Sequence, residues 1–230
     1  MLVLDACYKK ADLSSIVRDI KTLYQVEQEK LSRVLENYKD LFDGMLGTFK
    51  TKLLKLDLKP GEVPYQAILF QILMIHKETL KKELNWLCKI GILCKCLDSQ
   101  WASPSFIIPK KNGTVQFFTD LQRVNKKITR KVFPIPKIND LMQKLEGFTW
   151  VTALDLNMGY YHICLDPDAQ KVCYIAFTWG KYQYLHLPMG MNCTPDVFQE
   201  QMCKITSGLD FVKTYLDDLL MMTPIPWTII

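Results

Sequence analysis

The chain has 230 residues, 49% of them apolar, with 29 basic and 24 acidic side chains and a net charge of +5. This length can bury one or two ordinary cores, no apolar run reaches the roughly 18 residues of a membrane span, and the charge alone does not indicate a nucleic-acid partner. The apolar start at residues 1–4 is too short for a signal peptide, so we expect an intracellular protein, cytoplasmic or nuclear, without a membrane partner.

Residues 1–56 are expected to form a separate helical segment. Apolar side chains recur at helical spacing over residues 27–42, and the Asp-Gly pair at 43–44 is a typical stop signal. Proline and glycine in residues 59–64 then predict an extended connector. A second amphipathic helix is expected over residues 75–90. The glycine that directly follows, Gly91, is expected to end it.

The middle of the chain alternates strand, turn and helix signals. Residues 105–125 indicate a hairpin with a Lys-Lys-Asn-Gly turn, and Pro109 favours an edge position for its first strand. A short helix is expected over 136–147, a second hairpin has its tip at 179–181, and 194–208 begins with an N-cap signature and ends at a glycine. These elements predict an α+β fold in which helices cover one face of a small sheet.

The cysteines show no Cys-x-x-Cys spacing. Cys94 and Cys96 are separated by one residue, which is too close for half of a usual zinc ribbon. We therefore expect reduced thiols, as in most intracellular proteins. The cysteines are Cys7, Cys88, Cys94, Cys96, Cys164, Cys173, Cys193 and Cys203.

Basic residues gather between positions 110 and 137, interleaved with phenylalanines. Such a surface suits contacts with nucleic-acid phosphates, with the aromatic rings as apolar support beneath it. A solvated basic face explains the same pattern, and the cluster alone does not decide between the two. Its members are Lys110, Lys111, Lys126, Lys127, Arg130, Lys131 and Lys137, with Phe117, Phe118 and Phe133.

Two adjacent carboxylates, Asp217 and Asp218, interrupt an apolar strand pair over residues 214–222. Two unit negative charges about 4 Å apart repel by roughly 4 kcal/mol at the effective dielectric of a protein surface. A shifted proton, a basic neighbour or a bound divalent cation must offset this repulsion. Asp155 ends another apolar run and adds a third acid, which favours a phosphate-handling metal site. A hairpin whose turn is merely acidic is the competing interpretation of the pair.

Several ordered motifs carry a family resemblance. They are Pro104-Ser105-Phe106 with Lys110-Lys111-Asn112-Gly113, Asp120 with Asn125-Lys126, Phe133-Pro134-Ile135-Pro136, Leu154-Asp155-Leu156 with Gly159-Tyr160, Leu187-Pro188-Met189-Gly190, Pro195 with Phe198-Gln199, and Tyr215-Leu216-Asp217-Asp218. In order and approximate spacing they resemble a reverse transcriptase of the gypsy-type group of LTR retrotransposons. The resemblance covers roughly residues 57–223, and the ordered set is far more specific than any single motif.

The resemblance implies a role for each matched position. Asp155, Asp217 and Asp218 match the catalytic carboxylates and, with the carbonyl of Leu156, are the expected ligands of two Mg²⁺ ions, for which Mn²⁺ can substitute. Tyr160 matches the gate that favours deoxynucleotides over ribonucleotides. The expected nucleotide-binding residues are Lys110, Lys111, Gln116, Tyr160, Met189 and Gly190. The expected template and primer residues are Gln122, Asn125 and Tyr215.

The resemblance also implies polymerase fingers and a partial palm, the palm built on a ferredoxin-like mixed sheet with helices on one face. The expected divisions are a helical protease-to-polymerase connector over 1–56, fingers over 57–129 and 163–193, and palm over 130–162 and 194–230. Because Ile230 follows soon after the carboxylate pair, we expect the thumb, ribonuclease H and integrase regions to be absent.

Gln116 and Gln122 stand where the family usually has arginine. Loss of one charge-assisted hydrogen bond costs roughly 1.5–3 kcal/mol, or about 10- to 150-fold in binding or rate. The expected function is DNA synthesis from deoxynucleoside triphosphates on an RNA or DNA template-primer, by a fragment of a retrotransposon polyprotein. A non-catalytic nucleic-acid-binding relic and a degenerate pseudogene fragment are the alternatives. A homo-oligomer and a larger polyprotein are both compatible contexts.

Overall fold

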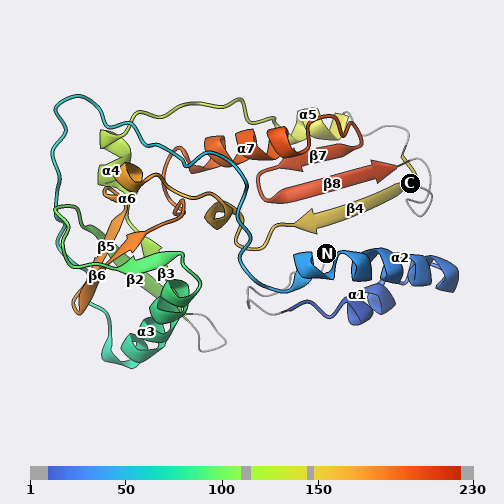
Figure 1. Cartoon of the computed structure of the whole chain (residues 1–230), viewed down its shortest axis with the longest axis horizontal. Coiled ribbons are helices and arrows are strands. Elements are labelled where there is room, and N and C mark those ends of the chain that lie inside the picture. Colours follow the sequence, from blue (N-terminus) through green and yellow to red (C-terminus); the bar gives the residue numbers. More distant parts are fainter. Residues whose placement is uncertain (1–9, 110–114, 144–147, 224–230) are drawn as a thin grey trace. The chain divides into compact units, whose positions relative to one another are not determined.

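The computed structural model describes residues 10–109, 115–143 and 148–223, and its chain divides into two compact units (Figure 1). Each unit gathers segments that are distant in sequence. The first comprises Met1–Gly47, Ile135–Asn157 and Met202–Ile230, and the second comprises Thr48–Pro134 and Met158–Gln201. The fold therefore depends on long-range contacts rather than on the order of elements along the chain.

Helices and strands alternate in both units. The first unit contains α1 (Leu13–Asp19), α2 (Gln25–Asn37), the 3₁₀ helix η1 (Lys39–Phe42), α5 (Ile138–Gln143), β4 (Trp150–Asp155), β7 (Val212–Tyr215) and β8 (Asp218–Thr223). The second contains α3 (Met74–Lys89), β1 (Leu93–Lys95), β2 (Ser103–Pro109), β3 (Val115–Thr119), α4 (Gln122–Lys127), the 3₁₀ helix η2 (Gly159–His162), α6 (Pro167–Gln170), β5 (Tyr174–Phe177) and β6 (Gly180–Tyr184). The helix α7 (Thr194–Ile205) contributes to both.

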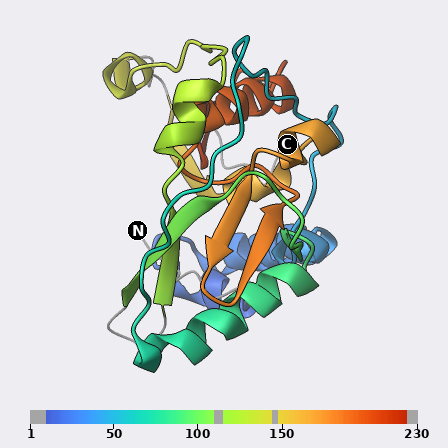
Figure 2. The same cartoon turned by 90° about the vertical axis from the view of Figure 1, so that its left-hand side faces the viewer.

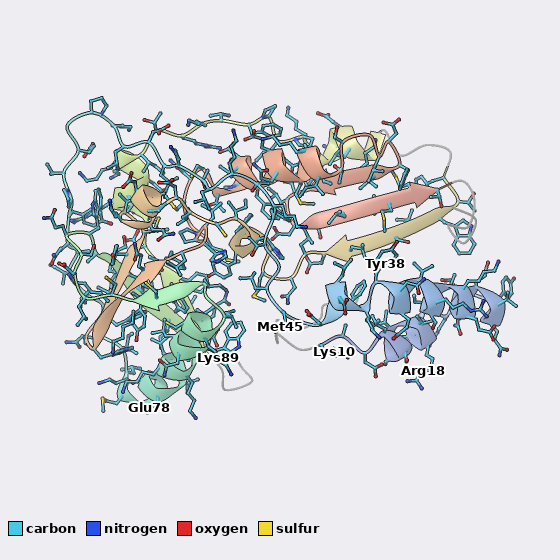
Figure 3. The ribbon with its side chains drawn as sticks, viewed as in Figure 1. Lys10, Arg18, Tyr38, Met45, Glu78 and Lys89 are labelled. Carbon is cyan, nitrogen blue, oxygen red and sulfur yellow. The ribbon has the colours of Figure 1, made fainter. Side chains whose placement is uncertain are left out.

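The predicted helix over residues 27–42 is split in the structure. α2 ends at Asn37, and the chain continues as the short 3₁₀ helix η1 before Gly44 adopts a left-handed φ of 78°. The aromatic side chain between the two helices, Tyr38, is 60% exposed (Figure 3), so little packing holds this turn in the α-helical form. By contrast, the helix expected over 75–90 is confirmed as α3.

β4, β8 and β7 form an antiparallel three-stranded sheet with β8 in the middle (Figure 1). Val212, Thr214 and Thr223 are buried on one face, whereas Val151 on the opposite face is 46% exposed. Alternation along each strand therefore produces one packed and one open face. The register sets Asp155 opposite Asp218 at one end of the sheet.

The second sheet has five strands in the order β1-β6-β5-β2-β3. All neighbouring pairs in this sheet are antiparallel except β2 and β5, which lie in the ranges expected to form the fingers. The described strands in the ranges expected to form the palm, β4, β8 and β7, are all antiparallel. α3 runs alongside it (Figure 2) and buries Leu80, Leu84 and Leu87, which share one helical face.

Pro109 does not mark an edge strand, because β2 pairs with β3 on one side and with β5 on the other. The pairing with β5 involves only Ser103 and Pro104, at the opposite end of the strand. A proline is tolerated at position 109 because the described hydrogen bonding between β2 and β5 does not reach this end of β2, so the missing N–H of Pro109 interrupts none of it. The Lys-Lys-Asn-Gly turn that follows, and the expected helix end at Gly147, lie outside the described residues.

The thiol prediction is confirmed for the part of the chain that the structure describes, where every cysteine is free. Cys7 lies outside it. Among the described helices, none has the length and apolar character needed to cross a lipid bilayer.

An ion pair between a buried carboxylate and a partly exposed arginine ties α7 to the segment after α4. Asp196 is 1% exposed and accepts hydrogen bonds from Arg130 Nε at 2.6 Å, from an Arg130 terminal nitrogen at 3.2 Å and from the Phe133 N–H at 3.1 Å. Burial by itself would raise the pKa of Asp196, but these donors and the guanidinium charge lower it below the usual value. The carboxylate is therefore ionised and fully engaged.

Asp196→Ala should lower the free energy of unfolding by about 3 kcal/mol, because three hydrogen bonds to a buried carboxylate are lost. Urea denaturation followed by circular dichroism measures this change. Asp57→Ala is the matched control, since Asp57 pairs with Lys131 at 2.7 Å but both side chains are largely exposed. Equal losses in the two variants would contradict the structural role of Asp196.

Candidate active site

The two acids lie on a tight hairpin turn. β7 ends at Tyr215 and β8 begins at Asp218, so only Leu216 and Asp217 connect the strands. Two-residue hairpin turns require a positive φ, and Leu216 supplies it with φ 51°. A left-handed conformation is unfavourable for a residue with a branched side chain, and such strain is often found at functional sites. The turn fixes Asp217 at the tip and Asp218 at the first position of the strand.

Asp155 reaches the same end of the sheet from β4. Asp218 is the register partner of both Asp155 and Tyr215, and partners across antiparallel strands project to the same face. The Leu156 N–H donates to the carbonyl of Asp217 at 3.0 Å, which ties the end of β4 to the turn. The structure thus brings together Asp155, Leu156, Tyr215, Asp217 and Asp218, as the sequence predicts.

The electrostatics of the three acids differ. Asp155 and Asp218 are exposed, whereas Asp217 is half-buried. Burial, followed by the negative charges of Asp155 and Asp218, raises the pKa of Asp217 to about 6. Its Oδ1 atom is buried and has no hydrogen-bond partner among the described residues. This oxygen is an acceptor without a donor, which a proton or a cation would satisfy.

The donor set suits a hard cation. Carboxylate and carbonyl oxygens are the ligands that Mg²⁺ and Mn²⁺ prefer. Within the described residues, however, no three Asp, Glu, His or Cys side chains are grouped so that they alone could hold a metal ion. Mg²⁺ usually binds through one or two carboxylates and completes its shell with water or substrate phosphates. The unpartnered Asp217 oxygen and the neighbouring acids fit this partial kind of site.

Apart from Tyr215, the expected nucleotide and template residues belong to the second unit. Tyr160 is the second residue of η2. This 3₁₀ helix begins directly after Met158, whose φ is 58°. Its ring packs edge-on against Phe198, with the centroids 5.1 Å apart. Gln116 on β3 and Gln122 at the start of α4 are both exposed. Lys110 and Lys111 lie outside the described residues.

Asn125 holds the loop that carries Met189 and Gly190. Its amide nitrogen donates to the Gly190 carbonyl at 2.8 Å, and its amide oxygen accepts from the Asn192 N–H at 2.9 Å. Gly190 has φ 93°, a backbone conformation that other residues rarely adopt, so glycine suits the position. Asn125 therefore uses its side-chain amide within the protein, while Met189 is 49% exposed beside it.

A cavity that the sequence did not indicate lies next to β2 and α4. Its volume is about 380 Å³, and the Arg123 guanidinium lies over the ring of Tyr65 at 5.6 Å. Tyr65 also exchanges a hydrogen bond with the Ser103 hydroxyl at 3.0 Å. Arg123 and Tyr65 are far apart in sequence, so no spacing could have linked them. The lining residues are Tyr65, Gln66, Ala67, Ile68, Leu69, Phe70, Pro104, Asp120 and Arg123.

Comparison with protein families identifies the family of this chain. A family model described as reverse transcriptase (RNA-dependent DNA polymerase) matches residues 77–226, which is more than half of the chain. The chain belongs to the reverse transcriptase family. The matched region contains all three acids, Tyr160 and the Asn125 loop contacts.

Relatives of this reverse transcriptase chain include much longer proteins. A Caenorhabditis elegans protein, K02A2.6, is 27% identical over 215 residues, covering 92% of the chain and 17% of the relative. The retrovirus-related Pol polyprotein from transposon 412 of Drosophila melanogaster is 30% identical over 130 residues, covering 53% of the chain and 10% of the polyprotein. The chain thus spans less than a quarter of the length of these two relatives.

Solved structures confirm the expected α+β fold. The foamy viral protease-reverse transcriptase in complex with RNA/DNA hybrid matches with a TM-score of 0.83 at 19% identity, covering 93% of this chain and 29% of the viral chain. At this identity the likeness establishes the fold alone. The likeness in fold therefore covers a larger share of the chain than the region that the family model matches.

The raised pKa of Asp217 predicts a pH dependence of stability in metal-free buffer. Between about pH 4, the usual aspartate pKa, and about pH 6, the folded protein binds more protons than the unfolded chain. The free energy of unfolding should therefore fall as the pH rises through this window. In Asp217→Asn the fall should be smaller, as measured by the melting temperature at each pH. Exposed Asp210→Asn is the control and should behave as the parent protein; a parent-like profile in Asp217→Asn would contradict the assignment.

Proposed function

We propose that this chain is part of the polyprotein of a gypsy-type LTR retrotransposon and catalyses template-directed DNA synthesis from deoxynucleoside triphosphates on RNA or DNA. The observation that carries the proposal is the convergence of Asp155, Asp217 and Asp218 at one hairpin end, with the Asp217 oxygen unpartnered. The family match and the similarity to the transposon 412 polyprotein support it.

Asp155, Asp217, Asp218 and the Leu156 carbonyl are the residues that would hold Mg²⁺ or Mn²⁺. Two bound ions would supply a more acidic primer 3′-hydroxyl and neutralise charge on the triphosphate oxygens. The contribution of the chain is to present ionised oxygens in a fixed arrangement. Asp217 has to lose its proton to act as a ligand, and its pKa of about 6 keeps most of it ionised at neutral pH. Tyr215, on the same sheet face as Asp155 and Asp218, is proposed to contact the primer end.

The second unit is proposed to select and orient the nucleotide. Tyr160 is the proposed gate against a ribose 2′-hydroxyl, and Met189 with Gly190 is proposed to support the incoming base. Asn125 acts on template and nucleotide through the loop that it holds, because both ends of its side-chain amide are engaged there. Lys110, Lys111 and Gln116 are proposed to face the triphosphate, and Gln122 the template strand.

The proposed divisions follow the family. Residues 57–129 and 163–193 are assigned to the fingers and 130–162 and 194–230 to the palm, with 1–56 as a connector from a preceding protease. The compact units differ from this division, since the second unit begins at Thr48 and retains residues 158–201. A parent polyprotein made inside the cell agrees with the free thiols of the described chain.

Primer extension on an RNA template with Mg²⁺ tests the function. The parent protein should extend a DNA primer, and Asp155→Asn and Asp217→Asn should reduce extension to background, because each removes a charged metal ligand. Asp210→Asn, which changes an exposed acid on the loop before β7, should retain parent activity.

Two outcomes would count against the proposal. Equal extension by the parent and Asp217→Asn would show that the acids are not catalytic. Template binding that is sensitive to salt but indifferent to Mg²⁺ and to Asp155→Ala, without extension, would instead identify a non-catalytic nucleic-acid-binding relic.

Restoring the family's arginines should increase activity. Gln116 and Gln122 are exposed, so an arginine fits at either position without repacking the core. Gln116→Arg should raise kcat/KM for deoxynucleotides by about 10- to 150-fold, the effect of one charge-assisted hydrogen bond. Gln122→Arg should instead tighten template binding. Steady-state extension and template titration measure the two effects separately, and Gln183→Arg outside the expected site provides the charge-matched control. An equal gain in activity or template binding in Gln183→Arg would show that the added positive charge, and not the position of the arginine, causes the effect.

A further inference from the structure

The segment from Thr48 to Leu58 runs beside the chain that follows the proposed gate. The Phe49 N–H donates to the His162 carbonyl and the Leu54 N–H donates to the Cys164 carbonyl, each at 2.9 Å. The Asp166 N–H donates back to the Leu54 carbonyl at 2.8 Å. These bonds fix the segment against residues 162–166, within the second unit.

A chain of aromatic contacts leads from this segment to Tyr160. The Phe49 ring stacks on His162 with centroids 5.2 Å apart and an interplanar angle of 22°. It also contacts Phe198 at 5.9 Å, and Phe198 meets Tyr160 edge-to-face at 5.1 Å and 90°. Phe198 is completely buried. Phe198 therefore contacts both Phe49 and Tyr160, and in a closely packed interior a change in one of these contacts alters the other.

The backbone around Tyr160 provides little rigidity of its own. η2 is a single four-residue 3₁₀ turn that follows Met158 in the left-handed region. The Tyr161 N–H donates to the Met158 carbonyl at 2.8 Å, and the Ile163 N–H donates to the Tyr160 carbonyl at 3.2 Å. Short 3₁₀ turns have poor hydrogen-bond geometry, so packing must contribute to fixing the ring.

We propose that Phe49 is a positioning residue that holds the Tyr160 ring through Phe198 and thereby sets discrimination between deoxyribose and ribose. The inference rests on the proposed function, because it assigns a specificity determinant to the same site. Phe49 itself contacts neither nucleotide nor metal. Truncating Phe49 leaves space beside Phe198, into which the Phe198 ring can move. The Tyr160 ring can then shift away from the position in which it excludes a 2′-hydroxyl.

Competition between dCTP and CTP in primer extension tests the effect on specificity. Phe49→Leu should reduce the ratio of kcat/KM for dCTP over CTP by about tenfold, mainly by lowering KM for CTP, with kcat for dCTP nearly unchanged. Phe49→Tyr keeps the stacked ring and should restore the parent ratio. Leu53→Ala is the control, since Leu53 is 50% exposed on the same segment. A parent ratio in Phe49→Leu, or the same fall in Leu53→Ala, would overturn the inference while leaving the proposed function intact.

The ring signals of Tyr160 provide a readout that needs no activity. In aromatic NMR spectra assigned with Tyr160→Phe, Phe49→Leu should shift and broaden the Tyr160 ring resonances, and Phe49→Tyr should return them towards the parent positions. Unchanged Tyr160 signals in a folded Phe49→Leu protein would overturn the inference. If the parent protein fails to extend any primer, the proposed function fails, and these spectra alone decide whether Phe49 holds Tyr160.

Discussion

The close approach of negative charges at the β7–β8 turn is the constraint on which the rest of the site depends. A two-residue connection leaves Asp217 no freedom to move away from Asp218, and the register of β4 adds Asp155 opposite. Leu216 adopts an unfavourable φ to make this turn possible. The sheet thus holds three carboxylates together, and the buried Asp217 Oδ1 has no donor among the described residues, an arrangement that a bound cation would balance.

The pKa values of Asp196 and Asp217 are shifted in opposite directions, although burial acts to raise both. Asp196 is nearly inaccessible, yet its pKa is lowered because Arg130 and a backbone N–H saturate its oxygens. Asp217 is less buried, but its pKa is raised because burial is not offset by any described donor and the charges of Asp155 and Asp218 act in the same direction. The difference separates a carboxylate that stabilises the fold from one that costs stability and is available for chemistry.

Local sequence signals were sufficient for some of the regular elements, such as the helix start at Thr194 and the extent of α3. The meeting of the three acids at one sheet end was expected from the family resemblance, since Asp155 is distant in sequence from the other two. Contacts across the sequence could not be obtained this way. Asn125 matches a template-associated motif, but the motif does not indicate that its side-chain amide is hydrogen-bonded to the backbone of Gly190 and Asn192. The Tyr65–Arg123 contact likewise depends on how β2 and α4 pack, which no pattern within either segment specifies.

The segment after Thr48 is hydrogen-bonded to residues 162–166, so the start of the family match and the start of the compact unit fall at different residues. Sequence similarity to the family model begins at residue 77, but the second compact unit begins at Thr48. The backbone of the Cys164 region is paired with a segment that lies outside the matched region. A recombinant protein cut where the family match begins would leave the carbonyls of His162 and Cys164 and the N–H of Asp166 without these partners. The backbone around Cys164 therefore depends on a segment that the family model does not include.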